Sequence, residues 1–199
     1  MIESKKTQLE RLNALMSLCN NCSLRKGCSQ VVPGDGNPEA EIMFIGEAPG
    51  KKEDELGKPF VGAAGKFLEE MLAAIKMKRE DVYIANVCKC RPPENRDPLP
   101  EEIETCWPWL EKQIEIINPT LIITLGRHSL GRFFPLMKIS EVHGKAFRRE
   151  FPNLGNKSLP AGRQVFYALY HPAAALYNGS MRETLIKDFK RSPKVLEKI

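Results

Sequence analysis

Apolar residues gather along the chain in short continuous blocks that alternate with helical stripes. Four blocks, each bounded by polar or turn residues, predict buried β-strands. They span residues 41–46, 82–87, 120–125 and 165–169. The intervening segments repeat apolar side chains every three or four residues, as amphipathic helices do. Helices are therefore expected over residues 4–18, 64–77, 100–117, 128–136 and 181–191.

This alternation indicates βαβ units, which place helices on both faces of a parallel sheet. The sequence thus predicts an α/β fold, a three-layer α/β/α domain with a central, mostly parallel four-stranded sheet. Residues 139–163 follow neither period, and we expect a ribbon and a long turn there, around PNLGN and LPAG. Because the 199 residues contain no linker-like stretch, a single domain over residues 1–199 is expected.

The segment 46–66, between the first strand and the next helix, is expected to be a ligand-binding loop. Its 21 residues hold five glycines, two prolines and eight charged side chains, too polar a composition for a core. Glycine allows main-chain N–H groups to approach a ligand closely. A phosphate-binding P-loop is excluded because Phe60 stands at its first glycine position and Phe67 follows Lys66. A G-x-G-x-x-G motif after the first strand is also absent.

Candidate binding residues stand at the carboxyl ends of the predicted strands. The loops after the first, second and fourth strands open on one edge of the sheet. They comprise residues 46–62, 86–96 and 171–182. An amide such as that of Asn86 donates and accepts at once, as the edge of a pyrimidine requires. Asn86, His171 and Phe60 are therefore candidates for contacts with a ligand. The alternative is an ordinary structural role for Asn86 and His171, and packing in the core for Phe60.

The charge balance and the amino terminus bear on partners and location. Lys and Arg outnumber Asp and Glu by 30 to 25, a mild excess that is compatible with a polyanionic partner without demonstrating one. Residues 1–19 carry charges where a signal peptide needs an apolar run, and no segment approaches about 18 uninterrupted apolar residues. A cytoplasmic protein without a membrane contact is therefore expected.

The six cysteines indicate ligand chemistry, because disulfides are rare in a reducing compartment. Cys19 and Cys22 form a C-x2-C pair, and Cys90 and Cys106 stand at the two ends of a proline loop and helix start. Four thiolates from two segments suit a tetrahedral zinc ion or a four-iron cluster, and spacing does not separate the two. Burial as small apolar side chains is a further alternative. The remaining cysteines are left out of the ligand set: Cys28 and Cys88.

Four motifs, in their order and spacing, resemble the family 4 uracil-DNA glycosylases, the iron–sulfur members of the uracil-DNA glycosylase superfamily. They are GEAPG at 46–50, GKPFVGAAG at 57–65, NVCKCRPPENR at 86–96 with the later Cys106, and HPAAAL at 171–176. The resemblance covers about residues 15–190. It implies a DNA repair enzyme that flips uracil out of DNA, hydrolyses its N-glycosidic bond and leaves an abasic site.

The resemblance also assigns the cysteines and the contacts to the base. It implies a [4Fe-4S] cluster with the ligands Cys19, Cys22, Cys90 and Cys106. It implies that Glu47 and Ala48 contact the uracil and its sugar. Phe60 is the ring that stacks on the flipped base, Asn86 the amide that reads its O4 and N3 edge, and His171 the histidine beside O2.

Ala48 departs from the best-studied family of this superfamily, in which an Asp at this position places the attacking water. Ala48 excludes water activation from this position and leaves Glu53, a carboxylate of the same pocket by resemblance, as a candidate replacement. We therefore expect stabilisation of the departing uracil to outweigh water activation, with a neutral His171 as donor. The catalytic candidates are His171, Glu53 and Glu47.

The expected partner is uracil-containing DNA, single- or double-stranded, bound by a monomer. Base flipping needs a side chain that fills the stack, for which Leu176 and Tyr177 are candidates. Arg182 on the basic C-terminal helix is a candidate phosphate contact, and an ordinary solvated face is its alternative. Two other functions stay open: a glycosylase acting also on hypoxanthine or xanthine, and a non-catalytic cysteine-metal module that binds nucleic acid.

Overall fold

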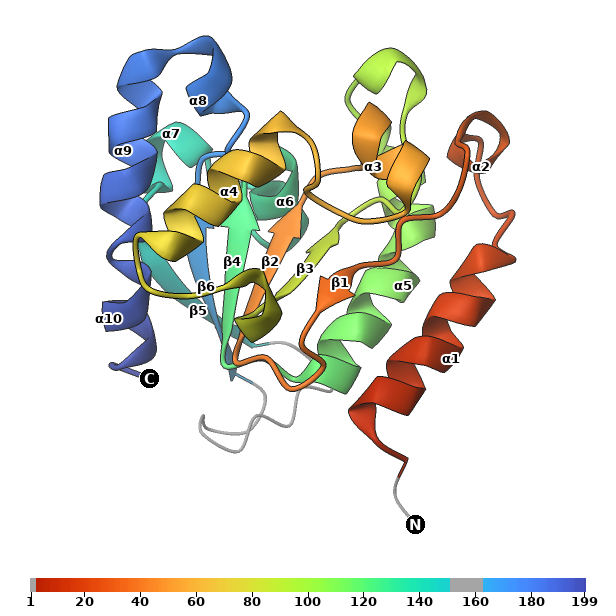
Figure 1. The fold of residues 1–199 in the computed structure, drawn as a ribbon, viewed down its shortest axis with the longest axis horizontal. Helices are drawn as coiled ribbons and strands as arrows, with labels where there is room; N and C mark the ends of the chain where they lie inside the picture. The colour runs from red at the N-terminus through yellow and green to blue at the C-terminus, as the bar shows by residue number, and fades with distance from the viewer. Residues whose placement is uncertain (1–2, 151–162) are drawn as a thin grey trace.

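The computed structural model describes residues 3–150 and 163–199, which build one six-stranded sheet of order β1-β3-β2-β4-β6-β5 (Figure 1). Four neighbouring strands are parallel: β3 (Tyr83–Asn86), β2 (Ile42–Gly46), β4 (Leu121–Leu125) and β6 (Arg163–Leu169). Two antiparallel strands form the edges: β1 (Asp35–Gly36) beside β3 and β5 (Ala146–Glu150) beside β6. The predicted α/β class and mostly parallel sheet are confirmed, but the strand number of four is wrong.

The missed edge strands lack the apolar signal of the central ones. β1 has only two residues, Asp35 and Gly36, inside a turn-rich segment. β5 is mostly exposed, with two arginines and a glutamate among its five residues. Its antiparallel pairing with β6 agrees with the ribbon expected in residues 139–163. The turn predicted around PNLGN and LPAG lies outside the described residues.

Helices cover both faces of the sheet, as the three-layer prediction requires (Figure 1). One face packs against α1 (Lys5–Ser17), α5 (Pro100–Ile117) and α6 (Arg127–Phe133). The other packs against α4 (Ala63–Ala73) and α9 (Gly179–Phe189). Because side chains alternate along a strand, Met43 and Ile45 of β2 enter the first core, and Ile42 and Phe44 enter the second. The parallel strands are therefore buried on both sides.

Short helical segments connect these elements. They are α2 (Leu24–Gly27), α3 (Lys51–Leu56), η1 (Arg79–Asp81), η2 (Pro93–Asn95), α7 (Ile139–Val142), α8 (Ala174–Tyr177) and α10 (Ser192–Leu196). The helix α3 corrects the expectation that residues 46–66 form only a loop. Asp54 of α3 is buried and accepts hydrogen bonds from the main chain and hydroxyl of Ser29, so this polar segment also has a packed side.

The strand order places the candidate binding segments. The chain runs from β2 to β3 on one side and then crosses to β4 on the other, so the order reverses at β2. In open α/β sheets, ligands bind outside the carboxyl ends of strands at such a point. The segments that follow β2, β3 and β6 start from this edge (Figure 1). Within the described ranges, no helix is long and apolar enough to cross a lipid bilayer.

Candidate active site and metal centre

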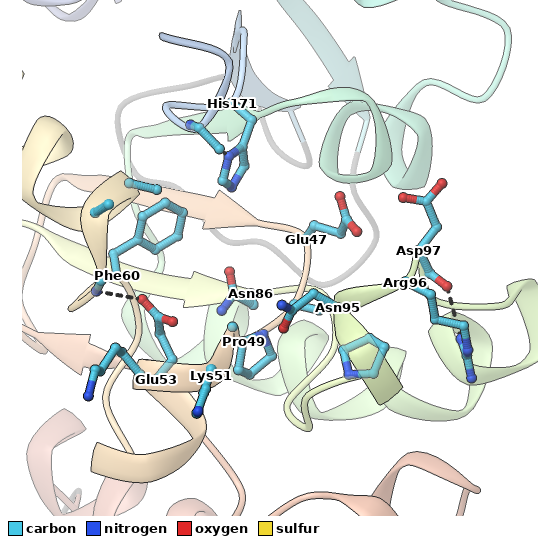
Figure 2. A pocket seen from close by; sticks show the side chains of 18 of the residues that line it. Glu47, Pro49, Lys51, Glu53, Phe60, Asn86, Asn95, Arg96, Asp97 and His171 are labelled. Carbon is cyan, nitrogen blue, oxygen red and sulfur yellow. Dashed lines mark hydrogen bonds between the residues drawn. The ribbon is translucent and has the colours of Figure 1, made fainter. Parts of the chain in front are cut away.

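A pocket of about 640 Å³ opens at the carboxyl edge of the sheet. Its walls come from the segment after β2, the segment after β3 and the segment after β6. Figure 2 shows Phe60, Asn86, Glu47 and His171 around the same space. The structure thus brings together six residues that the sequence assigned to the base site: Glu47, Ala48, Glu53, Phe60, Asn86 and His171.

His171 follows β6 and enters the pocket as a neutral imidazole. Its Nδ1 accepts a hydrogen bond from the main-chain N–H of Ala173 at 3.1 Å. Burial lowers the pKa of His171 to about 4, while the charge of Glu53 acts weakly in the opposite direction. A neutral ring with Nδ1 as acceptor carries its proton on Nε2. His171 therefore offers an N–H donor.

Asn86 ends β3 and has an unused acceptor. Its side chain is 2% exposed, and its Oδ1 has no hydrogen-bond partner in the part of the chain that the structure describes. A Cβ on Gly46 of the neighbouring strand would come within 2.4 Å of this oxygen, so glycine there leaves room for the amide. A buried polar atom without a partner is costly and is typical of a site that a ligand completes.

Phe60 forms an apolar wall of the pocket. Its ring is 5% exposed and lies 5.5 Å, centroid to centroid, from the His171 ring at an interplanar angle of 30°. A Cβ on Gly46 would come within 2.7 Å of the Phe60 ring, so Gly46 makes room for this ring as well as for Asn86. The ring therefore belongs to the core and to the pocket lining at once.

Glu53 holds the turn that carries Phe60. Its Oε1 accepts hydrogen bonds from the main-chain N–H groups of Val61 at 3.0 Å and Gly62 at 2.8 Å. Figure 2 shows its carboxylate below Phe60, with a dashed line to this turn. The sequence predicted a carboxylate of the pocket here. The structure adds that one of its oxygens is occupied by the protein itself.

The Glu47 carboxylate accepts no hydrogen bond from the described residues. It lies next to two side chains that the sequence analysis missed, those of His128 and Asp97. His128 Nε2 lies 3.8 Å from Glu47 Oε2 and 3.3 Å from Asp97 Oδ1. Burial raises the pKa of Glu47, and the nearby His128 acts in the opposite direction. His128 follows β4, whose carboxyl end opens on the same edge, and that position was the signal available in the sequence. Asp97, which follows Arg96, lines the pocket.

The residues assigned to DNA contacts separate in the structure. Tyr177 of α8 is 89% exposed and lines the pocket mouth, and Leu176 beside it is exposed. Arg182 of α9 instead pairs with Glu70 of α4 and lies 4.5 Å over the Phe67 ring, outside the pocket. Two lysines that the sequence analysis did not select lie on the pocket wall with exposed side chains: Lys51 and Lys52.

The four predicted metal ligands line one small apolar cavity between α1, α5 and the segment after β3. Cys19, Cys22, Cys90 and Cys106 contribute to its wall, together with apolar residues such as Met16 and Trp109. Burial raises the pKa of the Cys22 and Cys90 thiols. Thiols in such a dry place become thiolates readily only when a metal compensates the charge.

The cysteine sulfurs are spaced more widely than the ligands of a bound zinc ion. Four thiolates around zinc, with Zn–S bonds of about 2.3 Å, would lie only about 3.8 Å apart. Across residues 3–150 and 163–199, the one trio of His, Cys, Asp or Glu ligand atoms within 4.8 Å of one another is Glu47, Asp97 and His128. No three cysteine sulfurs are that close. The thiols therefore do not form the compact set of ligands that surrounds a single zinc ion.

Hydrogen bonds around the cavity also suit a sulfur-ligated centre. The main-chain N–H of Lys89 donates to Cys106 Sγ at 3.2 Å. The Cys88 thiol hydrogen-bonds Cys106 and lowers its pKa. Independently of any metal, Glu102 joins the two cysteine-bearing segments, accepting from Ser23 Oγ at 2.8 Å and from Arg96. Donors to ligand sulfurs are the usual surroundings of iron–sulfur clusters.

A buried lysine connects the cysteine cavity with the base pocket. Lys89 is 2% exposed, and its Nζ donates to the main-chain oxygen of Asn86 at 2.8 Å and to Gln113 Oε1 at 2.6 Å. Burial lowers the pKa of Lys89 to about 8, while the nearby Cys106 and Cys88 favour its charged form. One side chain thus supports the strand end that carries Asn86 and places a positive charge near the thiols.

Comparisons with known proteins agree with this arrangement. A sequence model of the Uracil DNA glycosylase superfamily matches residues 33–195. The Type-4 uracil-DNA glycosylase of Archaeoglobus fulgidus is 50% identical over 179 residues, covering 87% of this chain and 85% of that protein. The Type-4 enzyme of Sulfurisphaera tokodaii is 46% identical, covering 92% and 82%, and that of Thermotoga maritima is 38% identical, covering 96% and 95%. The superfamily match contains all the pocket residues named above, whereas Cys19 and Cys22 precede it.

Proposed function

The chain belongs to the uracil-DNA glycosylase superfamily, and on this premise we propose that it excises uracil from DNA by hydrolysing the N-glycosidic bond and leaves an abasic site. The observation that carries the proposal is the convergence of complementary groups in one pocket. A partnerless amide oxygen on Asn86, an N–H donor on His171 and the ring of Phe60 face the same space. A pyrimidine with a free Watson–Crick edge satisfies all three.

Recognition of the base follows from the donors and acceptors. Uracil N3–H donates to Asn86 Oδ1, and its O4 accepts from the amide nitrogen of Asn86. Uracil O2 accepts from His171 Nε2–H, and the ring of Phe60 packs on the base face. Because Asn86 Oδ1 has no hydrogen-bond partner among the described residues, the base supplies a hydrogen bond that these residues do not make.

Stabilisation of the departing uracil is the main catalytic contribution. Breaking the C1′–N1 bond leaves positive charge on the sugar and negative charge on uracil. His171 and Asn86 place donors at the two oxygens that share this negative charge, in a partly water-excluded pocket, where one such donor contributes about 3–4 kcal/mol. The low pKa of His171 keeps the ring neutral, so it donates a hydrogen bond to the uracil anion without transferring a proton.

Water then adds to C1′, and its proton goes to a carboxylate. Two oxygens of Glu47 are free of hydrogen bonds from the described residues, and burial raises its pKa, which makes it a better base. One oxygen of Glu53 is held by two N–H groups. We therefore assign the water to Glu47 and a supporting role to Glu53. Ala48, which also lines the pocket, has no group to activate a water.

DNA enters the pocket with the base flipped out of the stack, at a cost of a few kcal/mol. Exposed Tyr177, at the pocket mouth, is positioned to fill the space the base leaves, with Leu176 beside it. The rim lysines Lys51 and Lys52 are suited to phosphate contacts. Because Arg182 is paired with Glu70, its contact with phosphate requires that pair to open.

We further propose that Cys19, Cys22, Cys90 and Cys106 hold a [4Fe-4S] cluster. Three observations support this assignment: the common cavity, sulfurs spaced more widely than around a zinc ion, and the Lys89 main-chain N–H that donates to Cys106. Such a cluster supplies cross-linking here, not electron transfer, because hydrolysis moves no electrons. It ties the segment after α1 to the segment between β3 and α5. We also propose that the chain acts as a single-domain cytoplasmic monomer; sedimentation of the holoprotein as a dimer would contradict the monomer.

One assay tests the activity. The protein is incubated with single- and double-stranded oligonucleotides that carry one uracil, and hot alkali then cleaves abasic sites. Strand cleavage at the uracil position is expected, with a thymine oligonucleotide intact. Cleavage at hypoxanthine or xanthine would instead support the broader glycosylase, and binding without cleavage would support the non-catalytic module. A visible absorption spectrum of the same sample tests for the cluster.

A further inference from the structure

The turn that carries Phe60 has a strained backbone. Phe60 has a φ of 51°, in the left-handed region that residues with side chains rarely adopt. Its carbonyl lies so close to α4 that a Cβ on Gly65 would come within 1.9 Å of the Phe60 oxygen. A conformation of this kind persists only where the surrounding contacts hold it.

Arg79 supplies such contacts from η1, a segment distant in sequence. Its Nη1 donates to the main-chain oxygen of Phe60 at 3.0 Å, and its Nη2 donates to that of Pro59. Its Nε donates to Asp35 Oδ2 at 3.1 Å, on the edge strand β1. The side chain is only 16% exposed. The planar guanidinium thus uses its three nitrogens on fixed partners, a geometry that a lysine cannot reproduce.

The same turn is held from its other side by Glu53. The Glu53 carboxylate accepts from the N–H groups of Val61 and Gly62, directly after the carbonyls that Arg79 binds. Successive peptide groups are therefore held by opposite charges, a cation on the oxygens and an anion on the nitrogens. The hydrogen bonds from Arg79 and those to Glu53 both fix the backbone around Phe60, whose ring lines the pocket.

We propose that Arg79 is a positioning residue for uracil excision, which fixes the Phe60 turn and thereby the stacking ring. This inference rests on the proposed function. Arg79 is absent from the residues that line the pocket, so it acts on the base through Phe60. The ring it positions stands 5.5 Å from the ring of His171, and a small shift of the turn would change how the base sits under that histidine.

A double-mutant cycle tests the proposal. Arg79→Met removes the guanidinium and keeps much of the side-chain volume. We expect kcat/KM for uracil excision to fall about 10- to 100-fold, because a misplacement of about 1 Å has effects of this size. Inhibition by free uracil should weaken in parallel. In a Phe60→Leu background the same substitution should change excision less than about twofold, because coupled residues are not additive.

The control is Arg132→Met, which removes another largely buried arginine, paired with Glu104 and stacked on Trp107. It should leave excision and uracil inhibition unchanged. Arg79→Lys should restore less than half of the lost activity. An equal loss from Arg79→Met in wild-type and Phe60→Leu proteins would overturn the proposal, as would unchanged excision.

Two further results separate folding and function from positioning. If Arg79→Met does not fold, Asp35→Asn gives the milder form of the same cycle, because it removes the nearer of the two carboxylates that pair with Arg79, Asp35 at 3.1 Å and Glu69 at 3.8 Å. Its effect should also vanish in the Phe60→Leu background, and an undiminished effect there would overturn the proposal. Absence of excision by the wild-type protein would contradict the proposed function, whereas additivity in an active wild type contradicts only the role of Arg79.

Discussion

The base pocket and the cysteine cavity lie at the two ends of Lys89, and they are built in opposite ways. The pocket is held in shape by the protein's own hydrogen bonds, from Glu53 and Arg79 around Phe60, and leaves unused the atoms that a base would bind. The cavity is apolar, and burial there raises the pKa of the Cys22 and Cys90 thiols, so a metal is needed to compensate the charge of their thiolates. The pocket is preorganised by the protein itself for the proposed excision, whereas the cavity needs the proposed cluster to compensate the charge of its thiolates.

The largest effect is expected from breaking the cavity. Cys106→Ala removes a ligand that comes from α5, so the cluster should be lost and the segment after α1 should be held to α5 less firmly, through contacts such as that between Ser23 and Glu102. Structural zinc sites contribute on the order of 10 kcal/mol to folding, and a large contribution is expected from the proposed cluster for the same reason, since it links two segments of the chain. Colourless, poorly folded protein without excision is expected in the absorption and circular dichroism spectra. A Cys28→Ala control should stay brown and folded; a brown, active Cys106→Ala protein would show that the ligand set is wrong.

Substitution of a pocket residue should instead abolish most of the excision activity and leave the fold intact. His171→Ala removes the Nε2–H donor, and a loss of about 10²- to 10³-fold in single-turnover excision is expected for one such donor. The cluster spectrum, thermal unfolding and binding to uracil-free duplex should match those of the wild type. Unchanged turnover would contradict the role of His171.

A smaller loss distinguishes the two carboxylates of the pocket. Glu47→Gln removes the base assigned to the water, and excision should fall by about 10²-fold, the lower end for general base catalysis. Glu53→Gln keeps an oxygen for Val61 and Gly62 and should lose less. Rate constants at saturating enzyme measure the difference. A larger loss from Glu53→Gln than from Glu47→Gln would identify Glu53 as the carboxylate that activates the water.

The smallest effect is expected at the connection between the two regions. Lys89→Met leaves Gln113 Oε1 and the Asn86 main-chain oxygen without their donor, and such groups cost about 1–3 kcal/mol each when buried. A lower thermal midpoint and roughly tenfold slower excision are expected, with the brown colour retained. The control Lys112→Met removes an exposed lysine paired with Glu115 and should have neither effect. If Lys89→Met and Lys112→Met had the same thermal midpoint and excision rate, Lys89 would have no role in linking the cavity to the pocket.

The sequence predicted the parts of the fold whose signals are local. Buried runs such as residues 41–46 fall on parallel strands, and the helix from Pro100 begins with proline and acids, as its structure confirms. The edge strand β1 and the helix α3 were missed, because two residues in a turn and the polar run KKEDEL have no apolar period. Their positions depend on tertiary contacts, with β3 and with Ser29.

The site divides in the same way. Residues at strand ends, such as Asn86 and His171, could be predicted because topology brings the carboxyl ends of parallel strands together. Asp97 and Arg79 could not, since each matters through a neighbour: Asp97 beside His128, and Arg79 on the carbonyl of Phe60. His128 follows the strand β4, and that position offered a signal that the sequence analysis did not use. Motif and position find the side chains that line the pocket. They do not find the side chains that hold those atoms.

The central claim, a neutral His171 that stabilises departing uracil, is tested most directly by the pH dependence of single-turnover excision between about pH 4.5 and 8.5. The folded-state pKa of His171 is depressed to about 4 from an ordinary value of 6.5, so the neutral ring prevails throughout this range. Excision should stay high from neutral to alkaline pH and decline only toward the acid end, where His171 and Glu47 take up protons. A rate that falls as pH rises through 6–7 would identify an imidazolium acid and contradict this mechanism.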